Sequence, residues 1–402
     1  MYRSIATIKA DAARRSYAAT GDSVVWAVVD SGIEASHPHF QTYGTLHGAV
    51  EGLHRDFTTD KKIPGQGTAL QDTTGHGTHV AGIIAGGLPE AYGSSPEHKP
   101  VRIGRRMAVS EESGLERIES REAPDASLLT GAAPRCKLIS LKVIGSNGRS
   151  RSTDVIRALE YIRTELNGHG KPPLRVHGVN ISLGYDFNAK WFACGQSPIC
   201  VEVNRLVRSG VVVVIAAGNT GYGELSSATG LTNTGLSLTI NDPGNADLAI
   251  TVGSTHRDSP HTYGVSFFSS KGPTGDGRLK PDLVAPGERV FSCAAGMLFE
   301  ELVAGGILTE EEREEYLEKK KRGEYDEKGE LNVAAYIDKS GTSMAAPHVS
   351  GAIASFLSIR REFIGRPLEV KRIFLDSATS LGRERYFEGY GLVDLMRAIQ
   401  SV

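Results

Sequence analysis

Alternating strand-like and helix-like segments constrain the fold of this chain more than any other feature of its sequence. The strand-like segments are apolar almost throughout, as in the run VVVVI at 211–215, so they are expected to be buried on both faces. Such strands alternating with helices are typical of an α/β domain with a mostly parallel sheet and helices on both faces. Strands are predicted at 24–29, 138–143, 176–182, 211–216 and 248–253, and helices at 76–85, 152–166, 202–209 and 343–357.

The composition is that of a globular protein with a substantial core. Of 402 residues, 40% are hydrophobic and 23% are charged, and the formal net charge is -2 at pH 7. This balance gives no electrostatic reason to bind nucleic acid or an anionic membrane, and no apolar run approaches the length of a membrane span. We therefore expect no nucleic-acid partner and no membrane association.

Two of the predicted strands are followed by polar side chains that suit a catalytic site. Asp30 follows the strand at 24–29, and Asn219 follows the strand at 211–216 after a glycine. The carboxyl ends of parallel strands meet at one edge of a sheet, so these side chains are expected near a common crevice. Asn219 is placed to donate a side-chain hydrogen bond to an oxyanion.

Two short motifs open apolar helices with reactive side chains. His76 lies in GHGTHVAG at 75–82, and Ser343 lies in GTSMAAPHV at 341–349. A helix N-terminus offers unpaired N–H groups and a partial positive charge, which suit a serine nucleophile whose attack creates an oxyanion. A serine-rich turn before a helix is usually only a cap, but a serine with a histidine base and an orienting acid forms a catalytic set. His79 and His348 are alternative bases by residue type, and we interpret both as structural.

In the order Asp30, His76, Asn219, Ser343, the chain resembles the subtilisin-like serine proteases over roughly residues 21 to 395. The resemblance implies a serine endopeptidase in which Ser343 attacks the peptide carbonyl, His76 transfers the proton and Asp30 orients His76. Asn219 and the Ser343 N–H would hold the oxyanion. Two alternatives stay open: a catalytically idle scaffold of the same fold that binds peptides or partners through its insertions, and an esterase or acyltransferase with the same triad.

The resemblance also implies how a peptide substrate binds. The segments 145–150 and 180–184 match the two edges that hold an extended peptide between them. Asn241 lies near the floor of the implied pocket for the residue before the cut. None of the pocket residues is charged, so this pocket is expected to prefer medium or large uncharged side chains, unless Glu224 folds into it. The implied substrate-binding residues are Gly148, Ser182, Leu183, Gly184, Ala216, Ala217, Gly218 and Asn241.

We interpret the chain as a single subtilisin-like domain at 21–402, preceded by an extension at 1–20 that packs on the body through a helix at 6–18. Three insertions are expected, at about 87–130, 222–239 and 297–338. The second is rich in Ser, Thr and Gly and could border the substrate cleft.

The third insertion contains a predicted helix that begins with a capping box at Thr309 and ends before Gly323. A regulatory protein could dock on this helix, but an exposed, solvated helix is the simpler interpretation.

The predicted chemistry requires no cofactor and no metal. In many subtilisin-like proteins a structural calcium is held in part by an Asp at the position of His39. Calcium prefers carboxylate and carbonyl oxygens, so the usual loop site is expected to be lost, while a structural calcium elsewhere stays open. The resemblance further predicts a cis bond at Asp242–Pro243.

Cysteine usage and the N-terminal residues favour a cytoplasmic location. The N-terminus MYRSIA shows neither the basic segment nor the apolar core of a signal peptide. Cys194 and Cys200 are close enough in sequence to form a bridge, but free thiols are favoured here and at Cys136 and Cys293. The alternative is a secreted enzyme whose upstream signal and propeptide are absent from this sequence.

Overall fold

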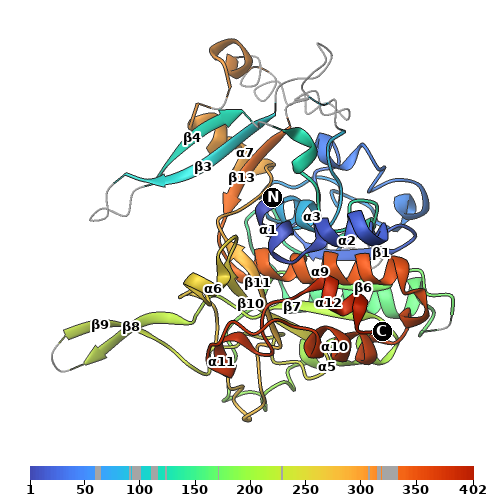
Figure 1. The fold of residues 1–402 in the computed structure, drawn as a ribbon, viewed down its shortest axis with the longest axis vertical. Coiled ribbons are helices and arrows are strands. Elements are labelled where there is room, and N and C mark those ends of the chain that lie inside the picture. Colours follow the sequence, from blue (N-terminus) through green and yellow to red (C-terminus); the bar gives the residue numbers. More distant parts are fainter. Residues whose placement is uncertain are drawn as a thin grey trace.

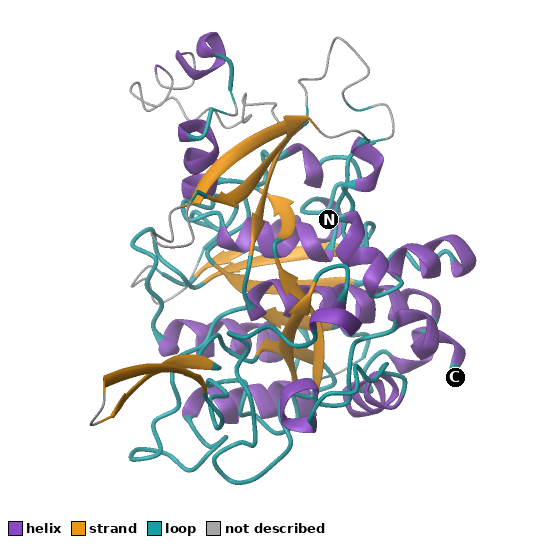
Figure 2. Ribbon diagram, turned by 60° about the vertical axis from the view of Figure 1, so that its left-hand side comes forward, coloured by secondary structure: helices purple, strands orange, loops and turns teal. Residues whose placement is uncertain are grey.

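The computed structural model describes residues 1–58, 65–89, 92, 101–109, 116–122, 125–170, 172–227, 230–306, 308–314, 318 and 334–402. Its centre is a seven-stranded parallel sheet with helices on both sides (Figures 1 and 2). This agrees with the predicted α/β class. The strand order is β11 (Leu283–Glu288), β10 (Ile250–His256), β7 (Val212–Ala216), β6 (Gly178–Ile181), β1 (Val25–Asp30), β5 (Lys137–Lys142) and β2 (Arg55–Asp56).

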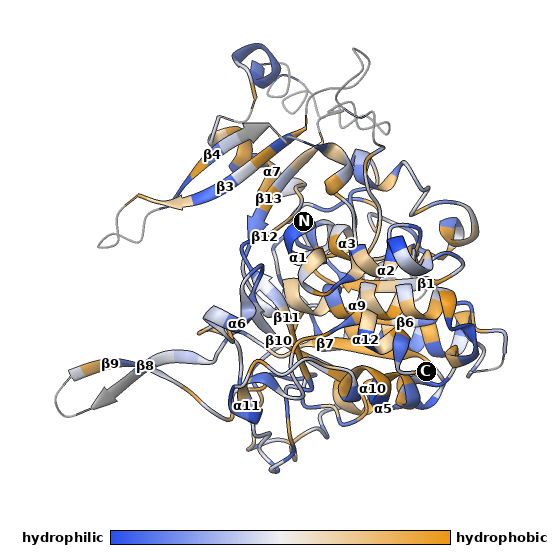
Figure 3. Cartoon of the chain, in the orientation of Figure 1, coloured by the Kyte–Doolittle hydropathy of each residue, from blue (hydrophilic) through white to orange (hydrophobic). Residues whose placement is uncertain are grey.

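Side chains of the central strands alternate between two hydrophobic layers. Along β1, Trp26 and Val28 join the layer beneath α3 (His76–Ile84) and α9 (Thr342–Ile359). Ala27 and Val29 join the layer beneath α4 (Ser152–Tyr161) and α5 (Pro198–Arg208). Burial on both faces explains why these strands are continuously apolar. Figure 3 shows the same contrast, with apolar colours along β7 and α9 and hydrophilic residues along β3 (Arg102–Ala108).

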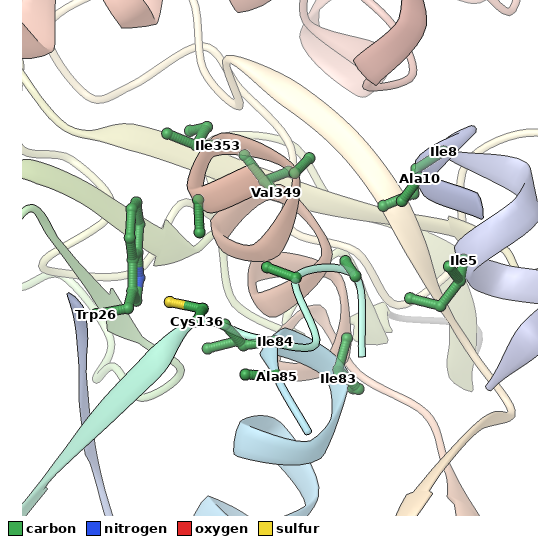
Figure 4. Close-up of a cluster of buried hydrophobic side chains, with 14 of the residues drawn as sticks. Ile5, Ile8, Ala10, Trp26, Ile83, Ile84, Ala85, Cys136, Val349 and Ile353 are labelled. Atoms are coloured by element: carbon green, nitrogen blue, oxygen red, sulfur yellow. The ribbon is translucent and has the colours of Figure 1, made fainter. Parts of the chain in front are cut away.

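The N-terminal segment packs on the body as two helices, where one helix at 6–18 was predicted. The helices α1 (Tyr2–Thr7) and α2 (Ala10–Tyr17) are separated by Lys9, which has a left-handed backbone with φ 60°. The break lets Ile5 and Ile8 as well as Ala13 face the main core, where they are at most 2% exposed. Figure 4 shows Ile5, Ile8 and Ala10 turned toward the α9 side of this core.

The first and third insertions combine into one structure beside the main sheet. It is a four-stranded sheet in the order β12 (Val290–Cys293), β13 (Ala335–Lys339), β3, β4 (Glu116–Glu122), which we call the satellite sheet. The helix α7 (Gly296–Ala304) packs on it around Leu302 and Ile337. A Cβ on Gly104 of β3 would lie 1.9 Å from Leu302 Cδ2, so the absence of a side chain there permits this close approach.

The second insertion forms a two-stranded ribbon, β8 (Tyr222–Ser227) with β9 (Gly230–Gly235), that projects from the body (Figure 1). None of its described residues lines the substrate cleft, so the expectation that it borders the cleft is wrong. Glu224 is exposed and pairs across the ribbon with Asn233.

Other local predictions have mixed outcomes. The Asp242–Pro243 bond is cis and all four cysteines are free, as predicted. The capping box at Thr309 forms, with the Thr309 N–H donating to Glu312 Oε2 (2.9 Å) and the Glu312 N–H donating to Thr309 Oγ1 (3.3 Å). The predicted end of that helix, at 319–323, lies outside the described residues.

Candidate active site

The four predicted catalytic side chains come from four elements that meet at the carboxyl edge of the main sheet. Asp30 ends β1, and Asn219 follows β7, the second neighbour of β1 across β6. His76 begins α3, and Ser343 is the second residue of α9. Because β1 and β7 run in the same direction, their carboxyl ends lie at one edge of the sheet. Open α/β sheets form their binding crevices at this edge.

Asp30 and His76 form a close pair. The Asp30 carboxylate is 1% exposed, and its Oδ1 lies 2.7 Å from His76 Nδ1 while accepting the Ser31 N–H at 2.8 Å. Burial lowers the pKa of His76, but the Asp30 charge and hydrogen bond act the other way, and the pKa is raised overall. The pair therefore fixes the ring with Nδ1 toward the acid and favours the protonated imidazole.

A second buried acid, Asp72, holds the segment that leads to His76. Its carboxylate accepts hydrogen bonds from the backbone or hydroxyl groups of Ser31, Thr74, Gly75 and Thr78, at 2.7 to 3.2 Å. These contacts join the end of β1 to the first turn of α3. The sequence predicted no role for Asp72, because its position four residues before His76 does not by itself reveal these contacts.

Ser343 and Ser182 exchange two hydrogen bonds across the cleft. The Ser343 hydroxyl donates to the Ser182 carbonyl at 2.9 Å, and the Ser182 hydroxyl donates to the Ser343 carbonyl at 2.9 Å. In the described part of the chain, Ser343 therefore makes no hydrogen bond to His76. Free active sites often show loose catalytic contacts, so this geometry is compatible with a catalytic pair of Ser343 and His76.

Asn219 has a fixed orientation. Its Oδ1 accepts from the Thr342 N–H at 2.9 Å and from the Thr342 hydroxyl at 3.1 Å. Within the described residues the amino group makes no hydrogen bond, so it is available as a donor at the start of α9, near the Ser343 N–H. Thr342 therefore sets the orientation of the Asn219 amide. Its position in the GTSMAAPHV motif did not predict this role.

A cleft of about 440 Å³ runs past these side chains. It brings together the predicted residues Gly148, Ser182, Leu183, Gly184, Ala216, Gly218 and Asn241 with His76, Asn219 and Ser343. Ala217 is fully buried and is not among the lining residues, so its predicted part in substrate binding stays a prediction. The remaining lining residues are Thr74, Ile144, Thr220 and Thr342.

The floor of the cleft is polar. Asn241 accepts from the Thr220 hydroxyl at 3.0 Å, and its amino group lies 3.4 Å from Asp186 Oδ1. Asp186 is exposed and does not line the cleft. Glu224 does not line it either. The described lining residues of the pocket are thus uncharged apart from His76.

The position implied for a calcium ligand is occupied by a buried histidine. His39 Nε2 lies 3.2 Å from the Gly82 carbonyl and 3.1 Å from the Ala85 carbonyl, and Nδ1 lies 3.0 Å from the Tyr336 hydroxyl. Burial, and then the neighbouring His37, lower the pKa of His39 to about 3, so the ring stays neutral. This donor set does not fit calcium. Within the described residues, no three His, Cys, Asp or Glu side chains converge on a metal position.

Compared with known protein families, residues 21–392 match the subtilase family of peptidases. The chain belongs to the subtilase family. The match spans the β1 acid, the α3 histidine and the α9 serine described above.

Individual relatives are distant. The chain is 29% identical to pyrolysin of Pyrococcus furiosus over 356 residues, which cover 81% of this chain and 21% of pyrolysin. It is 26% identical to the serine protease AprX of Bacillus subtilis, over 90% of this chain and 62% of AprX. It is also 26% identical to subtilisin E of Bacillus subtilis, over 98% of this chain and 70% of that protein. This subtilase thus spans less than two thirds of pyrolysin and of AprX.

Among the described helices of this subtilase, none is both long and apolar enough to cross a membrane.

Proposed function

We propose that this subtilase is a serine endopeptidase with Asp30, His76 and Ser343 as its triad and Asn219 as an oxyanion donor. The observation that carries the proposal is the buried Asp30 carboxylate 2.7 Å from His76 Nδ1, at a cleft that also contains Ser343 and the free amino group of Asn219. An acid, a ring and a hydroxyl in this relation are the parts that serine acyl transfer needs. Membership of the subtilase family supports the same conclusion.

In the proposed mechanism, Ser343 Oγ attacks the carbonyl carbon of the scissile peptide. His76 Nε2 accepts the hydroxyl proton, and Asp30 stabilises the imidazolium that forms. The Asn219 amino group and the Ser343 N–H donate to the developing oxyanion. His76 then passes the proton to the leaving amine, the C–N bond breaks, and an acyl group remains on Ser343. Water, activated by His76, hydrolyses this ester and restores the hydroxyl.

Substrate binding is proposed to use the lining of the same cleft. An extended peptide would lie between the edges that contain Gly148 and Ser182–Gly184, with main-chain hydrogen bonds on both sides. The side chain before the cut would enter between these residues and the pair Ala216 and Gly218, above Asn241. Uncharged lining residues support a preference for uncharged side chains, because a buried cation would need a facing carboxylate.

The remaining expectations stay proposals. We propose that the chemistry needs no cofactor, and the neutral His39 ring at the implied calcium position supports loss of that site. Polypeptides are the proposed substrates. Free, buried cysteines accord with the proposed cytoplasmic location, and a regulatory partner on the third insertion stays a prediction.

The test is covalent labelling by a serine-directed phosphonate, followed by peptide mapping. We expect a single adduct on Ser343 in the unmodified chain and none in Ser343→Ala, which should also lose peptide cleavage by several orders of magnitude. Ala suits the first turn of α9, so the melting temperature should stay unchanged. Unlabelled Ser343, or a Ser343→Ala protein that still cleaves peptides at a similar rate, would contradict the proposal.

A further inference from the structure

A second cavity lies at the end of the satellite sheet and has no part in the mechanism above. It has a volume of about 290 Å³ and a mainly charged lining. It shares no lining residue with the substrate cleft. Its lining residues are Arg106, Glu116, Arg289, Asp338, Lys339 and Ser340.

The cavity is close to the catalytic residues along the chain. Ser340 precedes Ser343 by three residues, a span of at most about 11 Å even for extended backbone. The satellite sheet also contacts the segment before His76, since the Met297 N–H of α7 donates to the Thr73 carbonyl at 2.9 Å. A Cβ on Gly75 would lie 2.1 Å from the Ala295 carbonyl, which shows how tightly these segments pack.

The part of the substrate after the cut, which departs with the leaving amine, is expected on the side of the cleft that faces this second cavity. The residues that hold the acyl half, such as Gly148, Gly184 and Asn241, line the other cavity. His76 delivers a proton to the leaving amine, so the leaving half lies beside His76. Lys339 lies four residues before Ser343 at the end of β13, and its charge is within electrostatic range of His76 and Asp30.

The two arginines of the cavity are already engaged. The Arg106 guanidinium pairs with Glu301 of α7 and donates to the Asp338 carbonyl. Arg289 donates to the Arg106 carbonyl at 2.8 Å, and Glu116 lies 3.9 to 4.0 Å from both guanidinium groups.

Lys339 differs from these arginines. It is half-buried, and within the described residues its ammonium makes no hydrogen bond and no ion pair. The neighbouring Asp338 carboxylate instead accepts the Arg106 N–H at 2.8 Å.

We propose that Lys339 recognises an acidic side chain within the first two residues after the cut. This inference rests on the proposed endopeptidase function and names a class of substrate for it. A carboxylate of Asp or Glu on the leaving half would supply the ion-pair partner that Lys339 lacks, in a half-buried cavity where such a contact is worth more than in open solvent. Cations on the leaving half would meet Arg289 and Lys339 and be disfavoured.

The experiment uses internally quenched peptides that are identical before the cut and carry Asp, Glu, Asn, Gln or Lys at the first or second position after it. For the unmodified chain we expect kcat/KM to be about ten-fold higher for the acid than for its amide at one of these positions, the effect of one charge-assisted contact. This ratio should fall as salt is raised, because screening weakens the ion pair.

Three variants of one residue and a matched control separate recognition from packing. Lys339→Gln should bring the acid-to-amide ratio to about one, and Lys339→Arg should retain most of it. Lys339→Glu should cleave the peptide that carries Lys faster than the peptides that carry Asp or Glu. The control Lys190→Gln changes an exposed lysine between β6 and α5 and should retain the full ratio. Phosphonate labelling of Ser343 in each variant reports whether the active site is intact.

The outcomes distinguish the two proposals. Cleavage with a ratio near one in the unmodified chain, or a full ratio in Lys339→Gln, would overturn the role of Lys339 and leave the endopeptidase function standing. Absence of both cleavage and labelling would overturn the endopeptidase function, and this inference with it.

Discussion

The main sheet and the satellite sheet bury their apolar side chains in different ways. The main sheet is covered on both faces, and its strands contribute to two large hydrophobic layers. The satellite sheet has one small cluster under α7, with Ala335 and Ile337 of β13 facing Leu298 and Leu302. Its other face meets the main body through Tyr336, which is fully buried beside His37 and His39. The satellite sheet is thus built onto the core and not independent of it.

The same comparison applies to the active site. Core strands and the helices packed on them position Asp30, His76 and Asn219, whereas β13 of the satellite sheet leads directly into Gly341 and Ser343. A change in the satellite sheet can therefore reach the nucleophile without passing through the core. The predictions below test how far the two regions can be separated.

The largest expected effect is on stability, from two matched cavity-forming changes. Ile353 in α9 and Leu302 in α7 are both fully buried. We expect Ile353→Ala to lower the free energy of unfolding by about 3–5 kcal/mol, because the rigid two-sided core relaxes little around the cavity. Leu302→Ala should cost about 2–3 kcal/mol, because the small cluster under α7 can collapse further. Urea unfolding measures both.

Amide hydrogen exchange tells the two changes apart. Leu302→Ala should lower protection in β3 and β13 and leave β1 and β7 protected, as expected for local opening. The control Leu231→Ala removes a side chain that is 71% exposed on the ribbon and should change stability by less than about 0.5 kcal/mol. Equal loss of protection in both sheets of the Leu302→Ala protein would show that they unfold as one unit.

The predictability of the two regions from sequence differs for the same physical reason. The predicted strands at 24–29, 138–143 and 211–216 lie within about one residue of β1, β5 and β7, because strands buried on both faces must be apolar throughout. The satellite strand β3, RIGRRMA, has no such signal, since its polar side chains face solvent or partners. Its pairing with β13 joins residues more than two hundred positions apart, which no local pattern indicates.

The site shows a similar division. Asp30, His76, Asn219 and Ser343 lie in motifs with strong local geometry, a strand end or a helix start. The structure places His76, Asn219 and Ser343 along one cleft and Asp30 beside His76. Asp72 and Thr342 act through contacts between elements, and the role proposed for Lys339 depends on the cavity beside it. Their roles depend on which groups the fold places beside them, so the residue types alone could not reveal them.

Asn219→Ala tests whether a residue positioned by the main sheet stabilises the transition state. We expect kcat to fall by about 10²–10³-fold, or about 3–4 kcal/mol, with little change in KM, because the amide donor is needed only as the oxyanion develops. Asn219→Asp is the matched variant, since it keeps an oxygen that can accept from Thr342 and removes the donor. It should lose at least as much activity. Steady-state kinetics in which KM rises while kcat holds would assign Asn219 to ground-state binding.

The smallest expected effect is the pH dependence set by the Asp30–His76 pair. Burial lowers the pKa of His76, but Asp30 raises it overall. The neutral ring is the base, so kcat/KM should rise with pH through a value above the ordinary 6.5 of histidine.

The same pair should affect stability with the opposite sign. Because the folded pKa of His76 is raised, its contribution to stability is full below the unfolded pKa and is lost as pH rises through the folded pKa. Activity therefore rises over the pH range in which this contribution disappears. Asp30→Asn removes the cause of the upward shift, so the acid limb of the normalised kcat/KM profile should move down and the stability change in this range should shrink. The buried His37 and His39, with pKa values lowered to about 4 and about 3, stay neutral across this range and do not mask the effect. An acid limb unmoved in Asp30→Asn would show that a group other than His76 controls the profile, with the satellite-side Lys339 as the next charge to vary.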